Sequence, residues 1–150
     1  MYNEDMEQII NRYSCGGVII HDGKVLVIAS PSRATISFPK GTKEPGETDE
    51  QTAIREVREE SGYNVKIIAR IATTEFEFTR EDGQRIDKAV TYFLMELADD
   101  KPPVQALEES EDFDVDWLSP DEARAQLTFD DAKGVLEKAL QAYAYKGQDA

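Results

Sequence analysis

Hydrophobic residues fall into short runs rich in β-branched side chains, separated by turn residues. The segment CGGVIIHDGKVLVIAS has apolar residues on both sides of Asp22-Gly23, a dipeptide typical of a two-residue β-hairpin turn. Another turn is predicted at residues 81–84, which read EDGQ. Enrichment in β-branched and aromatic residues predicts further strands at residues 36–38, 65–71, 74–78, 89–97 and 113–118.

The strongest helix signal lies between Thr48 and Gly62. Thr48 and Gln51 have the spacing of a capping box, and Asp49 and Glu50 place negative charge in the first turn, where the helix dipole favours it. Gly62 is well placed to end the helix in a left-handed conformation. The pattern predicts one helix across this segment.

Two more helices are predicted near the end of the chain. Ser119, Pro120 and Glu122 combine an N-cap, a proline at the first helical position and a capping-box glutamate. A longer helix is expected at about residues 130–145. Its apolar residues recur at spacings of three and four and predict a face buried in the core: Val135, Leu136, Ala139, Leu140 and Tyr143.

Loops are predicted where proline, glycine and charge replace this pattern. Residues 39–47, PKGTKEPGE, contain two prolines, two glycines and no apolar residue, and residues 101–103 open an acidic loop. Neither segment resembles a linker between domains. We therefore expect residues 1–150 to form a single mixed α/β domain.

Composition and charge narrow the function. Hydrophobic residues make up 40% of the chain and charged residues 32%, as in folded soluble domains, and the formal net charge is -14. A chain this acidic is not expected to bind nucleic acid stably or to bind an anionic membrane, and no apolar run approaches the roughly 20 residues that span a bilayer. Cys15 is the only cysteine, and the N-terminal residues show no secretory signal, so we expect a cytoplasmic protein.

The predicted helix carries a cluster of negative charge. At about 100° per residue, Glu56, Glu59 and Glu60 lie on an arc separate from the apolar face. Each like-charge neighbour costs about 0.2–0.5 kcal/mol of helix stability. One interpretation is a solvated charged face. The other is a site for a hard divalent cation such as Mg²⁺, which binds carboxylates together with substrate phosphates.

The segment from Gly41 to Tyr63 resembles the Nudix box. That motif reads glycine, five residues, glutamate, seven residues, then Arg-Glu-aliphatic-x-Glu-Glu-x-Gly-aliphatic. Only the last position departs, because Tyr63 is aromatic. The resemblance extends from about Tyr13 to Tyr143 and implies the Nudix fold, a mixed β-sheet sandwiched between α-helices. The matching residues are Gly41, Glu47, Arg55, Glu56, Val57, Glu59, Glu60 and Gly62.

The resemblance also implies a reaction, the Mg²⁺-dependent hydrolysis of a nucleoside diphosphate linked to another group. Mn²⁺ could replace Mg²⁺. Glu56, Glu59 and Glu60 would bind the metal with the backbone carbonyl of Lys40, while Arg55 and Glu47 would hold the glutamates in place. The general base would be Glu56, Glu59 or an acid from a later loop. Glu111, six residues before Trp117, would be a further metal ligand.

Segments outside the box resemble asymmetrical diadenosine tetraphosphate hydrolases. The resemblance rests on FPKGTKEPGE, KAVTYFLMEL and WLSPDEARAQLTF. It implies that Tyr92 stacks on a base, although a strand tyrosine is also often a core residue. Polyphosphate would meet the basic residues Arg33, Lys40, Lys43 and Lys88.

Other functions stay open at this stage. A diphosphoinositol polyphosphate is a less suitable ligand for so acidic a chain. Hydrolysis of RNA 5′ triphosphates or of nucleoside triphosphates is compatible with the box, as is a nucleotide-binding module without catalysis. An isomerase of the same fold would need more histidine than His21 provides. We expect a small-molecule nucleotide substrate and a monomer or homodimer.

Overall fold

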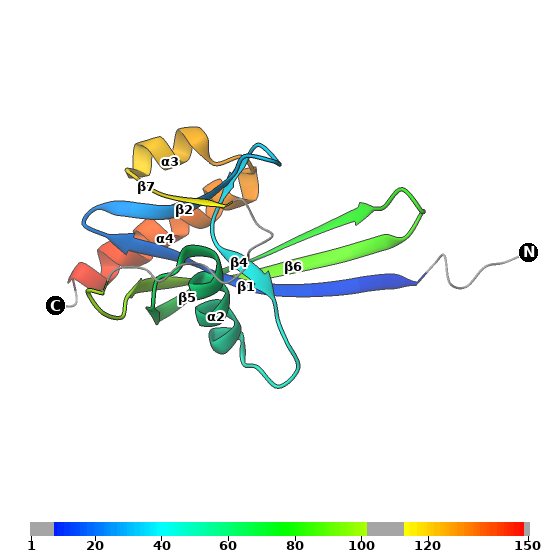
Figure 1. The fold of residues 1–150 in the computed structure, drawn as a ribbon, viewed down its shortest axis with the longest axis horizontal. Helices are drawn as coiled ribbons and strands as arrows, with labels where there is room; N and C mark the ends of the chain where they lie inside the picture. Colours follow the sequence, from blue (N-terminus) through cyan, green and yellow to red (C-terminus); the bar gives the residue numbers. More distant parts are fainter. Residues whose placement is uncertain (1–7, 102–112, 149–150) are drawn as a thin grey trace, which may run out of the picture.

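A computed structural model describes residues 8–101 and 113–148 (Figure 1). The strands of this part form one seven-stranded sheet in the order β3-β2-β1-β6-β5, with β4 pairing to β1 and β7 to β2. The elements are β1 (Ile9–His21), β2 (Lys24–Ser30), β3 (Thr35–Ser37), β4 (Lys40–Thr42), α2 (Asp49–Ser61), β5 (Val65–Thr79), β6 (Arg85–Leu97), β7 (Asp114–Leu118), α3 (Pro120–Gln126) and α4 (Asp130–Gln148).

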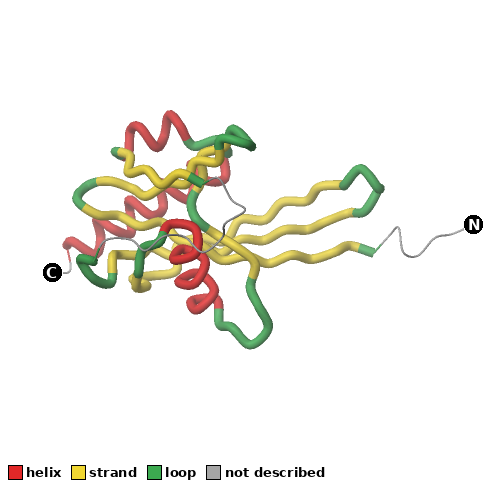
Figure 2. The backbone as a smooth tube through the Cα atoms, viewed as in Figure 1, coloured by secondary structure: helices red, strands yellow, loops and turns green. Residues whose placement is uncertain are grey.

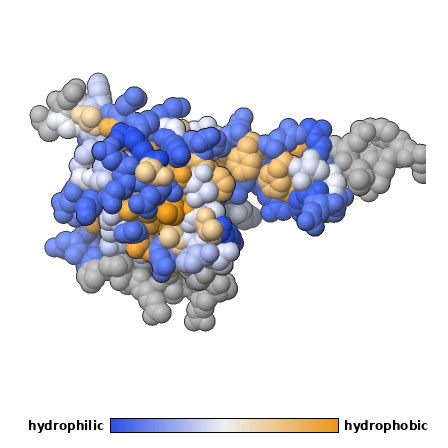
Figure 3. All heavy atoms as spheres, turned by 90° about the horizontal axis from the view of Figure 1, so that it is seen from above, coloured by the Kyte–Doolittle hydropathy of each residue, from blue (hydrophilic) through white to orange (hydrophobic). Residues whose placement is uncertain are grey.

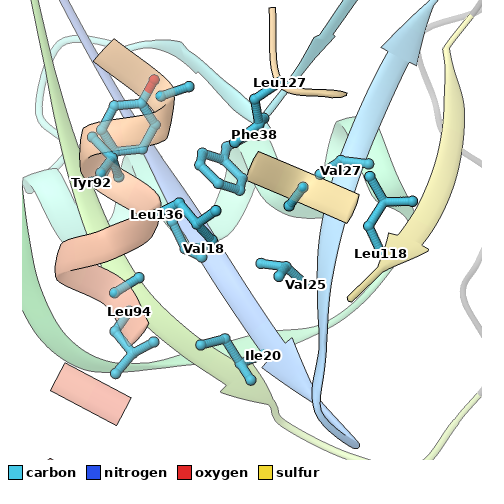
Figure 4. Close-up of a cluster of buried hydrophobic side chains, with 14 of the residues drawn as sticks. Val18, Ile20, Val25, Val27, Phe38, Tyr92, Leu94, Leu118, Leu127 and Leu136 are labelled. Carbon is cyan, nitrogen blue, oxygen red and sulfur yellow. The ribbon is translucent and has the colours of Figure 1, made fainter. Parts of the chain in front are cut away.

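The sheet lies between helices, as the resemblance implied. Helix α2 covers one face, where Ala53 and Val57 pack against Cys15, Ile19 and Phe93 (Figure 2). Helices α3 and α4 cover the other face. The core there includes Val18, Phe38, Tyr92, Leu94 and Leu136 (Figure 4). Side chains alternate between the faces along β1 and β6, so that even-numbered positions face α4 and odd-numbered positions face α2.

The predicted hairpin turn, the two capping boxes and the glycine at the end of α2 are confirmed. Asp22 and Gly23 both have positive φ, 51° and 74°, as a tight hairpin turn requires. Capping boxes are present at Thr48 and at Ser119, and Gly62 ends α2 with φ of 81°. These short-range contacts set the ends of both helices.

Three predictions need correction. The loop predicted at 39–47 contains β4, which pairs with residues 14–16 of β1. The strands predicted at 65–71 and 74–78 are one strand, β5, whose pairing with β6 is interrupted by two irregularities. Tyr143 was expected in the core, but it is 40% exposed, because it lines an open surface hollow with Ile20 and Leu97 at the ends of β1 and β6.

One part of the sheet extends beyond the helices. The first residues of β1, the end of β5 and the start of β6 form a three-stranded ribbon that projects from the body of the molecule (Figures 1 and 2). We call this ribbon the wing; it comprises residues 9–13, 74–79 and 85–89. Within the described ranges, no helix is long and apolar enough to cross a membrane.

Candidate active site

A tight turn at residues 44–47 positions Glu47 just before α2. Pro45 and Gly46 occupy the centre of this turn, and Gly46 has φ of 86°, a conformation that favours glycine. The turn closes through the Glu47 amide, which donates to the Glu44 carbonyl at 3.1 Å. Glu47 therefore sits immediately before the N-cap of α2, with its carboxylate directed to the first turns of the helix.

Arg55 is the centre of the ion-pair network on α2. Its Nε and Nη2 donate to the two oxygens of Glu47 at 2.7 and 3.0 Å, and Nη2 also donates to the Thr42 carbonyl at 3.0 Å. Its Nη1 lies 2.8 Å from Glu56 Oε1 and 3.2 Å from Glu59 Oε2. Arg55 thus connects the Glu47 turn to two glutamates of α2, and its supporting role, like that of Glu47, stays a prediction.

These contacts fix the charge state of the network. Hydrogen bonds from Arg55, followed by the Glu44 amide, lower the pKa of Glu47 to about 2. Hydrogen bonding to Glu47 likewise raises the pKa of Arg55. The Glu47–Arg55 pair therefore stays ionised at neutral pH and acts as a rigid connection between the turn and the helix.

Glu56 lies against the backbone of β4. Its side chain is buried, and a Cβ atom at Gly41 would lie 2.0 Å from its carboxyl carbon. The neighbouring Lys40 amide is 3.4 Å from Glu60 Oε2. Strand β4, which the sequence did not predict, therefore brings the Lys40–Gly41 backbone against the acidic face of α2.

The donors at this corner suit a hard divalent cation. Carboxylates and a main-chain carbonyl are oxygen ligands of the kind that Mg²⁺ and Mn²⁺ bind. Within the described ranges, however, no three acidic, histidine or cysteine side chains are arranged to hold one ion together. Arg55 contacts one oxygen each of Glu56 and Glu59. The ligand roles of Glu56, Glu59, Glu60 and the Lys40 carbonyl stay predictions.

A cluster of cations lies on the α4-facing side of the sheet. Arg12 and Lys88 are register partners on β1 and β6. Burial, followed by the nearby charge of Lys40 and then those of Arg12 and Arg33, lowers the pKa of Lys88 to about 8. We call Arg12, Arg33, Lys40 and Lys88 the cationic cluster. In a chain of net charge -14, such a grouping creates a local positive potential.

Lys40 connects the cationic cluster to the acidic helix. A Cβ atom at Gly16, its register partner on β1, would lie 2.6 Å from the Lys40 Cβ. The Lys40 side chain therefore starts on the face of the sheet that carries Arg12 and Lys88, while its amide faces Glu60. Lys40 therefore lies at the boundary between the cationic cluster and the carboxylates of α2.

Two predicted substrate contacts are engaged elsewhere. Lys43 Nζ pairs with Asp49 at 3.0 Å and lies over the Tyr13 ring, on the α2 side of the sheet. Tyr92 is 6% exposed, and its ring meets the Phe38 ring edge-on at 6.3 Å (Figure 4). Burial raises the pKa of its hydroxyl. Base stacking by Tyr92 would require the core around Phe38 to open, and it stays a prediction.

Two other residues complete the comparison with the sequence. Glu111 lies outside the described residues, so its predicted role as a metal ligand stays a prediction. Arg12 was missed, because nothing in the polar stretch around it indicates a site. Only its pairing with Lys88 across two strands 76 positions apart reveals it.

Comparison with known proteins places this geometry in a family. The chain matches the NUDIX domain over residues 11–138, and it belongs to that family. It is 32% identical over 140 residues to the MutT4 protein of Mycobacterium tuberculosis, covering 87% of this chain but only 55% of that protein. The chain thus spans about half the length of this relative.

Two further proteins similar to this chain are named as hydrolases of dinucleoside tetraphosphates. The asymmetrical bis(5′-nucleosyl)-tetraphosphatase of Sus scrofa is 36% identical over 103 residues, covering 69% of this chain and 68% of the relative. The structure of a Caenorhabditis elegans Ap4A hydrolase binary complex superimposes with a TM-score of 0.68 at 22% identity. That match covers 90% of this chain and 98% of the other. At such identity, the structural match supports the fold alone.

Proposed function

We propose that this chain is a metal-dependent pyrophosphohydrolase that cleaves a dinucleoside polyphosphate such as diadenosine tetraphosphate, releasing ATP and AMP. The observation that carries the proposal is the position of Lys40 between the acidic face of α2 and the cationic cluster. A phosphoanhydride needs both: carboxylates for a divalent ion, and cations for the phosphate oxygens.

Roles for the residues follow from this arrangement. Glu56, Glu59, Glu60 and the Lys40 carbonyl would hold the ion, which when bound supplies charge neutralisation and a more acidic water. Arg12, Arg33, Lys40 and Lys88 bind the phosphate chain. Glu56, Glu59 or an acid from a later loop accepts a proton as the water oxygen bonds to phosphorus and the bridging P–O bond breaks. The Glu47–Arg55 pair holds these carboxylates in position.

The choice of substrate rests on similarity outside the box. FPKGTKEPGE lies in the segment that forms β4 and the Glu47 turn, and the Sus scrofa relative acts, by its name, on nucleosyl tetraphosphates. The same geometry accommodates nucleoside triphosphates and nucleotide sugars. We further propose a small-molecule nucleotide substrate, a monomer or homodimer, and a cytoplasmic location.

A substrate panel tests the proposal. Wild-type protein and Glu59→Gln are incubated with Mg²⁺ or Mn²⁺ and with dinucleoside polyphosphates, nucleotide sugars, nucleoside triphosphates or triphosphorylated RNA, and the products are separated by chromatography. We expect ATP plus AMP from diadenosine tetraphosphate with the wild type, and little product with the variant. If a nucleotide sugar is hydrolysed in preference to diadenosine tetraphosphate, the proposed substrate is wrong. Nucleotide binding without any hydrolysis would show a binding module instead.

A further inference from the structure

Two exposed phenylalanines lie on the wing. Phe76 is 45% exposed and Phe78 is 41% exposed, and their rings stack with centroids 6.0 Å apart and an interplanar angle of 26°. Apolar atoms run along the wing in the space-filling view (Figure 3). A single exposed apolar side chain is common, but two rings in contact form a continuous apolar patch, and such patches mark binding surfaces.

Strand register places these rings beside the cationic cluster. Phe76 is the partner of Lys88 on β6, and Lys88 is in turn the partner of Arg12 on β1. Partners in adjacent strands point to the same face of a sheet, with Cα atoms about 4.5–5.5 Å apart. One face of the wing therefore carries a row formed by a phenylalanine, a lysine and an arginine.

The opposite face of the wing has the reverse character. Glu75, Glu77 and Asp87 occupy odd-numbered positions, which face away from the cationic cluster, and the one cation among the described odd-numbered positions of the wing, Arg85, is paired with Glu77. An anionic ligand would be repelled there and attracted to the face that carries Phe76 and Lys88. The two faces thus differ in charge although they belong to the same three strands.

The aromatic face also continues into the site. Along β6, Lys88 lies four residues from Tyr92 on the same face, a distance of about 14 Å at the rise of a β-strand. A phosphate chain bound at Lys40 and Lys88 would therefore leave one end of the ligand directed along the wing. Among the described residues of the wing, Phe76 and Phe78 are the exposed aromatic side chains that this end can reach.

We propose that Phe76 and Phe78 form a stacking platform for the second nucleoside of a dinucleoside polyphosphate. This inference rests on the proposed function and adds a specificity site to it. Aromatic rings stack on any nucleobase, so the platform would favour substrates with a base at both ends over those with one. The adjacent cations favour such a ligand over an uncharged apolar partner.

Two substrates with the same phosphate chain test the platform. Diadenosine tetraphosphate has a second nucleoside, whereas adenosine 5′-tetraphosphate lacks it. Phe76→Ala should raise KM for the dinucleoside about 10-fold, with kcat little changed and with KM for the mononucleoside unaffected. Phe76→Leu, which keeps the apolar contact but removes the ring, should behave like Phe76→Ala, and Phe76→Trp should restore KM. Glu75→Ala, on the opposite face of the same strand, should leave KM unchanged for both substrates.

The outcomes separate this inference from the proposed function. If the wild type cleaves diadenosine tetraphosphate and Phe76→Ala leaves both KM values unchanged, the platform is wrong while the proposed function stands. Wild-type inactivity on dinucleosides overturns both. If Phe76→Ala raises KM equally for both substrates, the substitution acts through the structure of the site, and the proposed platform is wrong. Sedimentation runs alongside: an oligomer lost in Phe76→Ala, with both KM values unchanged, would make this face a contact between copies.

Discussion

Gly41 shows how one missing side chain shapes the site. Its Cα lies so close to Glu56 that an added Cβ would be 2.0–2.4 Å from the carboxyl atoms. Those atoms are the far end of a flexible side chain, so the fold can accommodate a methyl group by moving the carboxylate. The box glycine is therefore needed for the position of Glu56 more than for the stability of the chain.

We expect Gly41→Ala to lower activity about 100-fold while leaving the fold intact, because a displacement near 1 Å in a catalytic group has an effect of this size. Activity with Mg²⁺ and the thermal midpoint are measured together. Gly134→Ala is the matched control: it has open space around it on α4 and should keep full activity. A destabilised but fully active Gly41→Ala would contradict this reading.

Lys88 is held at a cost to stability. Its folded pKa, about 8, lies below the ordinary value of 10.5 because of burial and then of Lys40. Between these pH values the unfolded chain binds more protons than the folded chain, so stability gains from this group as pH rises through that window. Below pH 8 the destabilisation is complete. A group kept at such a cost fits a role in binding phosphate.

Lys88→Met should therefore separate stability from function. At pH 7 we expect the free energy of unfolding to increase by about 1 kcal/mol, less than the full pKa shift would give at about 1.4 kcal/mol per unit, because Lys88 is only half-buried and solvent screens its charge. This gain should shrink from pH 8 towards pH 10.5. KM for the polyphosphate should rise about 10-fold. Lys24→Met, at an exposed position on β2, should change neither quantity. Denaturant unfolding at several pH values checks the sign.

At the scale of elements, α2 and α3 begin with the same device. In both, a hydroxyl N-cap accepts from the amide three residues later, at 3.1 Å, and the side chain at that position accepts from the N-cap amide at 2.9 Å. Only α2 carries the site: Glu47 directly precedes its N-cap, Thr48. The two helices therefore offer a comparison between a purely structural cap and one beside the site.

Thr48→Ala and Ser119→Ala should each lower the free energy of unfolding by about 1 kcal/mol, the usual effect of losing an N-cap. Only Thr48→Ala should also lower kcat, because fraying of the first turn loosens the Glu47–Arg55 pair. Chemical denaturation and steady-state kinetics on both variants test this. Equal activity in the two variants would show that the cap of α2 contributes stability alone.

These elements also show what the sequence could predict. Both caps and the hairpin turn depend on residues within a few positions, so their signals lie in one stretch of sequence. Strand β4 does not: Lys40–Thr42 has weak β-propensity and becomes a strand because residues 14–16 pair with it. The two predicted strands form one strand, β5, because Ala72 and Thr73 between them pair with Tyr92 and Thr91 of β6.

At the scale of the molecule, the two halves of the site differ in how they can be found. The acidic half lies within residues 41–62, and a motif on one helix reveals it. The cationic half brings together Arg12, Arg33, Lys40 and Lys88 from four separate segments. Only the folded chain brings them together, so the sequence indicated Lys40 and Lys88 by resemblance alone and Arg33 by its position in a loop. Lys43 was expected with them, but it pairs with Asp49.

Binding of Mg²⁺ to the folded chain should raise its thermal midpoint. A ligand that binds only the folded state at ten times its dissociation constant adds about 1.4 kcal/mol. Mg²⁺ should therefore raise the thermal midpoint of the wild type and of Glu75→Gln, and should raise that of Glu59→Gln much less. Both variants remove one negative charge, so screening of the net charge of -14 acts on them equally. Sodium chloride at matched ionic strength measures that screening. If Mg²⁺ shifts all three midpoints alike, the carboxylates of α2 are not the ligands, because a diffuse ion atmosphere would account for the whole effect.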